Sequence, residues 1–150
     1  MNDPSVHFSS NSVEWATPDA FFQTMNDEYR FDLDVCATTE NHKADQFFSP
    51  EDDGLAQEWA PHRCWMNPPY GREIKRWMKK AYSESLKGAL VVCLVPARTD
   101  TAWFQDYAMR GEITFLRGRL KFGGSKNSAP FPSAVVVFKP CPLSDGRNKK

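Results

Sequence analysis

Residues 89–95, with the sequence Ala-Leu-Val-Val-Cys-Leu-Val, form an apolar run without a polar residue. A strand with one face in water alternates apolar and polar residues, whereas a strand covered on both faces is apolar throughout. The run therefore predicts a central strand in a sheet that is covered on both faces. Pro96 ends this strand, because proline has no N–H to give to a neighbouring strand.

The remaining segments show patterns typical of strands and helices in alternation. Strands are expected at residues 31–37, 64–66, 112–116 and 134–138. Helices are expected from Thr17 as N-cap with Pro18 as first helical residue, over residues 55–59 and 72–87, and from Asp100 or Thr101 to Ala108. Residues 38–54 look polar and irregular. This alternation predicts an α/β fold with a mainly parallel sheet and helices on both faces.

Length and composition fit one globular domain. The chain has 150 residues, of which 41% are hydrophobic and 25% charged. We expect a flexible N-terminus over residues 1–12, a single domain over 13–139 and a flexible tail over 140–150. No apolar run is long enough to cross a membrane and no signal peptide is visible, so we expect a cytoplasmic protein. The four cysteines lie far apart, and neither disulfides nor a metal site are expected.

The net charge of zero hides a division between the two halves of the chain. Residues 1–70 contain 3 basic and 13 acidic residues, whereas residues 71–150 contain 16 basic and 6 acidic ones. The segment 117–133 is rich in Gly, Ser and Pro and carries basic residues without an acidic one, which is typical of a binding loop. The charges, interleaved with aromatic residues, favour a nucleic acid as partner of the C-terminal half.

Asn67-Pro68-Pro69-Tyr70 follows the short strand expected at residues 64–66. Each proline lacks an N–H and has a fixed φ, so the carbonyl groups here point in set directions. Asn67 adds a side-chain carbonyl, and we expect an exposed Tyr70 on which a planar ring can stack. Taken alone, the four residues also fit a plain Pro-Pro turn with an asparagine cap.

A planar base with an exocyclic amine fits these groups. The amine can donate one hydrogen to the Asn67 side-chain carbonyl and the other to the Pro68 backbone carbonyl. Both acceptors draw the nitrogen lone pair out of conjugation with the ring, so the amine can attack an activated methyl group. Ligands bind at the carboxyl ends of strands in open parallel sheets, so we expect residues 34–37, 67–70 and 96–99 to share one crevice.

These residues resemble the small phage and prophage DNA adenine methyltransferases of the Dam type. The matching features are Trp15-x-Thr17-Pro18, Asp34-x-Cys36-Ala37, Asp53-Gly54-Leu55, Asn67-Pro68-Pro69-Tyr70, Pro96-Ala97-Arg98-Thr99-Asp100-Thr101-x-Trp103-Phe104, Gly118-Arg119-Leu120-Lys121-Phe122 and Ala129-Pro130-Phe131-Pro132-Ser133. The resemblance implies a Rossmann-like S-adenosylmethionine-dependent methyltransferase fold with a reduced cofactor loop. It also implies transfer of a methyl group to the N-6 amine of an adenine flipped out of double-stranded DNA.

The resemblance implies roles for individual residues as well. The target adenine would be held by Asn67, Pro68, Pro69 and Tyr70. The cofactor would contact Trp15, Thr17, Pro18, Asp34, Cys36, Ala37 and Asp53, with Thr17 and Pro18 beside its methionine part and Asp53 near its adenine amine. DNA would contact Arg98, Thr99, Arg119 and Lys121, although an ordinary surface role fits each basic residue singly.

The sequence departs from the family pattern after Asp34. The glycine-rich cofactor loop is absent, and Cys36-Ala37-Thr38-Thr39 stands in its place. Asp53 follows Asp34 by only 19 residues, which is too short for the usual helix and second strand. The ribose partner stays open between Glu40, Asn41 and Asp45. Without a separate recognition domain, the DNA contacts are expected from loops 97–103 and 117–133.

Two other interpretations stay open at this stage. The same acceptor geometry serves enzymes that methylate an RNA base or a protein glutamine. The degenerate cofactor loop also fits a nucleic-acid-binding module without cofactor binding, although such a module does not require Asn67-Pro68-Pro69-Tyr70. GATC-like target sites are a guess from the resemblance alone, and a monomer is assumed.

Overall fold

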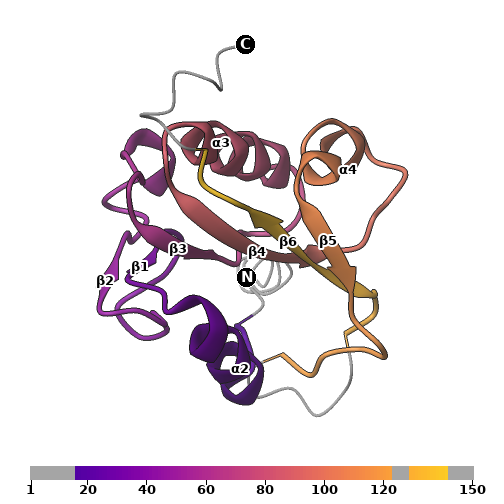
Figure 1. The fold of residues 1–150 in the computed structure, drawn as a ribbon. Coiled ribbons are helices and arrows are strands. Elements are labelled where there is room, and N and C mark those ends of the chain that lie inside the picture. The colour runs from indigo at the N-terminus through magenta and orange to yellow at the C-terminus, as the bar shows by residue number, and fades with distance from the viewer. Residues whose placement is uncertain (1–15, 123–128, 142–150) are drawn as a thin grey trace, which may run out of the picture.

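The computed structural model describes residues 16–122 and 129–141. Three predicted features lie outside the described residues: the flexible N-terminus, Trp15 and residues 142–150 of the flexible tail. Within these ranges, six strands form one sheet in the order β2-β1-β3-β4-β6-β5 (Figure 1). The strands are β1 (Leu33–Asp34), β2 (Gln46–Phe47), β3 (Arg63–Met66), β4 (Leu90–Pro96), β5 (Glu112–Phe115) and β6 (Ser133–Phe138).

The sheet is mixed, and our expectation of a mainly parallel sheet is wrong. β1 to β4 pair in parallel, whereas β6 lies antiparallel between β4 and β5. The cause is the connection from β5 to β6. A parallel return needs a crossover, usually a helix, and the described part of this connection contains none.

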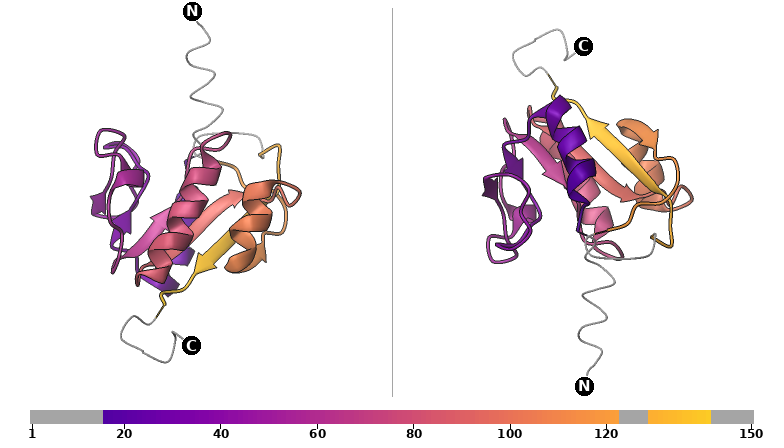
Figure 2. Two further views of the ribbon diagram at one scale, coloured as in Figure 1. Left: turned by 90° about the horizontal axis from the view of Figure 1, so that it is seen from above. Right: turned by 90° about the horizontal axis from the view of Figure 1, so that it is seen from below.

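Helices cover both faces of the sheet, as expected. α2 (Asp19–Tyr29) lies on one face, and α3 (Ile74–Leu86) and α4 (Ala102–Asp106) lie on the other, as the two views of Figure 2 show. Two short 3-10 helices, η1 (Gly54–Ala56) and η2 (Ala108–Arg110), also occur in the described chain. No helix among the described residues has the length and apolarity to cross a membrane.

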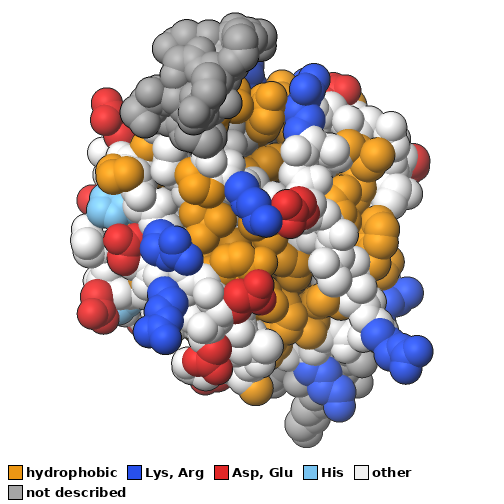
Figure 3. Space-filling model, in the orientation of Figure 1, with side chains coloured by type: hydrophobic (Ala, Val, Ile, Leu, Met, Phe, Trp, Pro, Cys, Tyr) orange, Lys and Arg blue, Asp and Glu red, His pale blue; other side chains and the backbone are white. Residues whose placement is uncertain are grey.

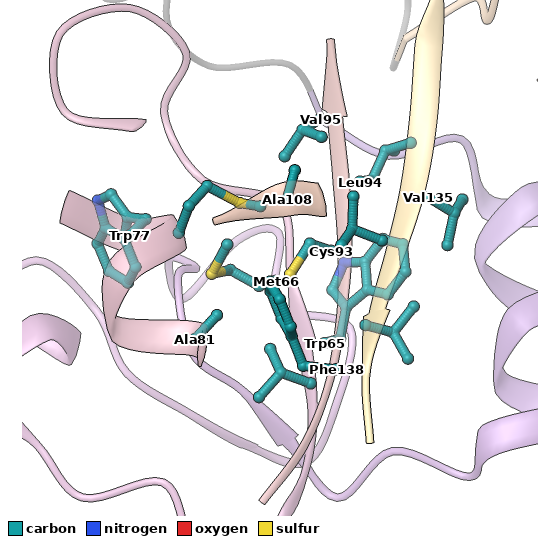
Figure 4. Packing of buried hydrophobic residues seen from close by; sticks show 14 of the residues in the cluster. Trp65, Met66, Trp77, Ala81, Cys93, Leu94, Val95, Ala108, Val135 and Phe138 are labelled. Atoms are coloured by element: carbon teal, nitrogen blue, oxygen red, sulfur yellow. The ribbon is translucent and has the colours of Figure 1, made fainter. Parts of the chain in front are cut away.

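The core forms around β4, whose seven residues are all buried, and this confirms the predicted central strand. α3 buries its apolar face on the sheet, including Ile74, Trp77, Met78 and Ala81, as its amphipathic pattern predicts. Figure 4 shows Trp77 and Ala81 packed with side chains of β3, β4 and β6. This packing holds the end of β3, and with it the chain that enters Asn67.

Helix α2 begins one residue later than expected. Pro18 is extended (φ −61°, ψ 136°) and stands at the N-cap position, so the first helical residue is Asp19. Thr17, the expected N-cap, instead accepts a hydrogen bond from the Asn67 side chain. Thr101 caps α4 as expected, because its Oγ1 accepts the N–H of Phe104 at 3.3 Å.

A short strand, β2, lies within the segment expected to be irregular. It pairs in parallel with β1 through Leu33–Gln46 and Asp34–Phe47. Two residues are too few to show an alternating pattern, which is why sequence reasoning missed this strand. The chain passes from β1 to β2 without a helix, in keeping with the short spacing between Asp34 and Asp53. The helix expected at residues 55–59 is the 3-10 helix η1.

Candidate active site

A cavity of about 310 Å³ lies at the carboxyl ends of β1, β2 and β3. Its volume is at the lower end of the range of roughly 300–1,000 Å³ that is typical of small-molecule sites. The predicted site residues that line it are Thr17, Asp34, Cys36, Ala37, Asp53, Asn67, Pro68 and Pro69. Pro18, Tyr70 and residues 96–99 do not line it, so two of the three expected strand-end segments share the cavity.

The side-chain amide of Asn67 is held at both ends. Its Nδ2 donates to the Thr17 hydroxyl at 3.1 Å, and its Oδ1 accepts a hydrogen bond from the Tyr70 hydroxyl at 3.0 Å. Thr17 and Tyr70 are only 4% and 5% exposed, so water competes weakly for these bonds. Asn67 itself is half-buried on the cavity wall. An amide oxygen has two lone pairs, so Oδ1 can accept from more than one donor.

Tyr70 is buried, and our expectation of an exposed stacking surface is wrong. Its ring packs edge-on against Phe131 and Phe122, with ring centroids 5.5 and 6.4 Å apart. These two phenylalanines flank residues 123–128 and cover the ring. Burial raises the pKa of the Tyr70 phenol far above its usual range, so the hydroxyl stays protonated. Its hydrogen lies between two acceptors, Asn67 Oδ1 and the Leu94 carbonyl oxygen at 3.2 Å.

Asp34 ends β1 and organises the loop that follows. Its Oδ1 accepts from the Cys36 N–H at 3.3 Å, and its Oδ2 accepts from the Lys43 N–H at 2.9 Å. Burial raises the pKa of Asp34 to about 6, and these two hydrogen bonds offset the rise only in part. The carboxyl group therefore fastens both ends of residues 36–43, the loop that begins with the segment standing in place of a glycine-rich loop.

Thr38 and Asn41 stabilise the middle of this loop. The Thr38 N–H donates to Asn41 Oδ1 at 2.7 Å, and the Asn41 N–H donates to Thr38 Oγ1 at 3.2 Å. Both residues line the cavity, whereas Glu40 and Asp45 do not. Of the three residues left open as ribose partner, only Asn41 is therefore placed at the cavity.

Residues 48–54 form another wall of the cavity. The N–H and hydroxyl of Ser49 donate to Asp52 Oδ2 at 2.9 and 3.1 Å, which closes a turn before Asp53. Asp53 has a positive φ of 58°, and Gly54 then passes close to β1. A Cβ on Gly54 would lie 2.3 Å from the Val35 carbonyl oxygen, so only glycine fits here without a shift.

The cavity also contains residues that sequence reasoning did not select for the site. They are Ala16, Thr38, Lys43, Phe48, Ser49, Pro50, Gly54, Trp65 and Trp77. Phe48 and Pro50 add an apolar wall, and Lys43 adds a charge that pairs with Asp19 at 2.7 Å. A position just after a strand would have marked Phe48, but β2 itself was not visible in the pattern. No group of three His, Cys, Asp or Glu side chains suited to a metal ion occurs among the described residues.

The four residues expected to contact DNA, which we call the basic rim, are Arg98, Thr99, Arg119 and Lys121. All four are exposed and lie outside the cavity. The loop after β4 and the β5–β6 connection are neighbours, because the Ala97 N–H donates to the Pro132 carbonyl at 2.8 Å. Figure 3 shows Lys and Arg side chains, without acidic ones among them, gathered at the lower right beside this connection. The cavity and this cationic edge are therefore separate features of the described structure.

Comparisons with known proteins agree on one family. A family model described as DNA N-6-adenine-methyltransferase (Dam) matches residues 6–141. The chain is 32% identical over 136 residues to the DNA N-6-adenine-methyltransferase of Haemophilus phage HP1 (strain HP1c1). The aligned region covers 84% of this chain and 78% of that protein. The chain is also 33% identical over 140 residues to the DNA N-6-adenine-methyltransferase of Escherichia phage T1. Here the aligned region covers 90% of this chain and 58% of that protein. The chain therefore belongs to the DNA N-6-adenine-methyltransferase (Dam) family.

Proposed function

We propose that this protein transfers a methyl group from S-adenosylmethionine to the N-6 amine of adenine in duplex DNA. One observation carries the proposal: the Asn67 amide, held by Thr17 and Tyr70, stands on the wall of a cavity that it shares with Asp34 and Asp53. Membership of the Dam family supports it. We further propose that β1 to β4 and their helices are a reduced form of the Rossmann-like methyltransferase fold.

The residues of the cavity fit S-adenosylmethionine, which joins a nucleoside to an amino acid. Phe48 and Pro50 provide an apolar wall for the flat base, and the exposed Asp53 carboxylate provides an acceptor for its amine. Asn41 provides a polar side chain for the ribose hydroxyls. When bound, this cofactor supplies an electrophilic methyl group. Trp15 and Pro18 keep the cofactor roles that the resemblance implies.

In this proposal, Asn67 Oδ1 and the Pro68 carbonyl oxygen accept the two amine hydrogens of the target adenine. They draw the nitrogen lone pair out of conjugation, so that the nitrogen would be able to take the methyl group. The sulfur–methyl bond of the donor would break to leave S-adenosylhomocysteine, and one amine proton would pass to water. No strong base is needed. Both acceptors are set before the substrate arrives, because Asn67 is hydrogen-bonded at each end and Pro68 has a fixed φ. Tyr70, being buried, contributes by holding Asn67 and not by stacking on the base.

The amine of a paired adenine lies inside the duplex, so the target base has to leave the stack before it can reach Asn67. We propose that the basic rim holds the phosphate backbone while the base is flipped. The rim lies on loops of the same chain as the cavity, in keeping with the monomer assumed above. The DNA substrate and the phage relatives favour the bacterial cytoplasm as its compartment.

Transfer of labelled methyl groups from S-adenosylmethionine to unmethylated duplex DNA tests the proposal. We expect label in N-6-methyladenine, and a loss of about 10²–10³ in turnover for Asn67→Ala, the size seen when one acceptor or donor of a preorganised site is removed. Cofactor binding to this variant should persist. Label in RNA or in protein glutamine instead would move the activity to that acceptor, and absence of cofactor binding would favour a nucleic-acid-binding module.

A further inference from the structure

We infer that Thr17 is a positioning residue for Asn67, whose amide it orients so that Oδ1 faces the target amine. This inference rests on the proposed function of Asn67. It differs from the role that the family resemblance implies for Thr17, which is contact with the methionine part of the cofactor. The two roles can be told apart: loss of a positioning residue lowers turnover and leaves cofactor affinity unchanged, whereas loss of a cofactor contact weakens cofactor affinity and leaves turnover intact.

The contact between Thr17 and Asn67 joins two parts of the chain that are 50 residues apart in sequence. Thr17 is 4% exposed and stands next to Pro18, the N-cap residue of α2. Pro18, and not Thr17, stands at the N-cap position of α2, although threonine before a helix is usually found in that role. The Thr17 hydroxyl instead receives Nδ2 of Asn67 at 3.1 Å. The start of α2 therefore serves as a fixed support for the amide.

An asparagine amide has two ends of similar size and opposite character, because its oxygen accepts and its nitrogen donates. A flip of the amide would turn Nδ2 of Asn67 toward the target amine, and two donors would then face each other. With Nδ2 engaged by Thr17, the protonated Tyr70 hydroxyl lies at the other end, 3.0 Å from Oδ1. In this arrangement Thr17 accepts from Nδ2 and Tyr70 donates to Oδ1, which is the pairing that leaves Oδ1 as the acceptor for the target amine.

Replacement of the hydroxyl by a methyl group in Thr17→Val tests the inference. We expect kcat to fall about 10- to 100-fold, as for a misplaced reacting group, while Kd for S-adenosylhomocysteine and KM for DNA change by less than about two-fold. Thr17→Ser keeps the hydroxyl and should restore most of kcat. Thr24→Val is the matched control, because Thr24 is exposed on α2 and its hydroxyl donates to the Ala20 carbonyl of the same helix. Its kcat should equal that of the wild type.

The same Thr17 substitution in the Asn67→Asp variant tests the orientation of the residue 67 side chain separately. In Asn67→Asp the carboxylate presents an acceptor at both ends, so a flip changes nothing. The factor by which Thr17→Val lowers kcat should therefore be smaller when residue 67 is Asp than when it is Asn. An equal or larger loss in the aspartate background would overturn the inference. If Thr17→Val does not fold, Thr17→Ala and Thr17→Ser make the same comparison.

Two further results would also overturn the inference. One is an unchanged kcat in Thr17→Val. The other is a weaker Kd for S-adenosylhomocysteine with kcat intact, which would assign Thr17 to the cofactor. An inactive Asn67→Ala beside a fully active Thr17→Val would refute only this inference. Wild-type turnover in Asn67→Ala would refute the proposed role of Asn67 directly.

Discussion

Arg98 lies over the ring of Phe131, with its Cζ 5.7 Å from the ring centroid, and Phe131 packs in turn on Tyr70. Arg98 belongs to the exposed basic rim, whereas Tyr70 is buried and bonds to the amide of Asn67. One aromatic side chain therefore connects a residue proposed to contact DNA with the residue that holds the proposed catalytic amide.

The variant Phe131→Leu should lower methyl transfer about tenfold and weaken DNA binding, because both Tyr70 and Arg98 lose a ring contact worth about 0.5–1.5 kcal/mol. Steady-state methylation and DNA titration measure the two effects. Phe115→Leu serves as control, since Phe115 is 59% exposed on the edge strand β5. Equal effects of the two variants would contradict a specific role of Phe131.

Gly54→Ala should destabilise the fold by about 2–3 kcal/mol, the cost of forcing extra atoms into a packed interior. The added Cβ would meet the Val35 carbonyl oxygen at 2.3 Å and the Trp77 ring at 3.1 Å. Gly118→Ala is the control, because Gly118 has a positive φ of 73° but open space around it, and should cost only about 1 kcal/mol. Denaturant unfolding compares them, and a smaller loss for Gly54→Ala would contradict the packing argument.

Asp34 should make stability depend on pH. Its pKa is about 6 in the fold against an ordinary value of 3.8, so the folded protein holds this proton more tightly than the unfolded chain. The stabilisation is fully present below about pH 3.8 and is lost as the pH rises through about 6, with a size on the order of 3 kcal/mol.

The variant Asp34→Asn does not titrate and isolates this effect. The unfolding free energy of the wild type minus that of Asp34→Asn should fall as the pH rises from about 4 to about 7. Urea unfolding at several pH values across this interval measures the difference. Parallel pH profiles of the two proteins would show that Asp34 has an ordinary pKa.

Lys121→Ala should weaken DNA binding and reduce the slope of log K against log salt by about 1, as expected when one phosphate contact is lost. Lys139→Ala is the control, because Lys139 follows β6 and pairs with Glu112 at 3.1 Å. Since β6 is antiparallel to β4, this end lies away from the carboxyl ends of the parallel strands. An unchanged salt slope in Lys121→Ala would exclude a phosphate contact there.

Sequence reasoning succeeded where a pattern carries its own physical cause. The apolar run of β4 and the amphipathic face of α3 are properties of contiguous residues, and both elements were predicted. The rule that loops after parallel strands meet also placed Asp34 and Asn67 at one cavity. These predictions needed no knowledge of distant contacts.

The errors concern contacts between residues far apart in the sequence. Nothing around Tyr70 indicates that Phe122 and Phe131 cover its ring. Thr17 has the local signature of a helix cap, and only the folded chain brings Asn67 to its hydroxyl. β6 runs antiparallel after a connection whose described part contains no crossover helix, and the strand pattern itself does not encode this direction.

The antiparallel placement of β6 divides the sheet into a parallel part, β1 to β4, and an antiparallel part formed by β5 and β6. The cavity belongs to the parallel strands β1 to β3, whereas the basic rim is carried by the loop after β4 and the connection to β6. A loop between antiparallel neighbours can change in length without shifting the strands that it joins. If the basic rim contacts DNA as proposed, insertions between Leu120 and Ala129, whose backbones pair at 2.8 Å, would change DNA binding while leaving the cavity intact.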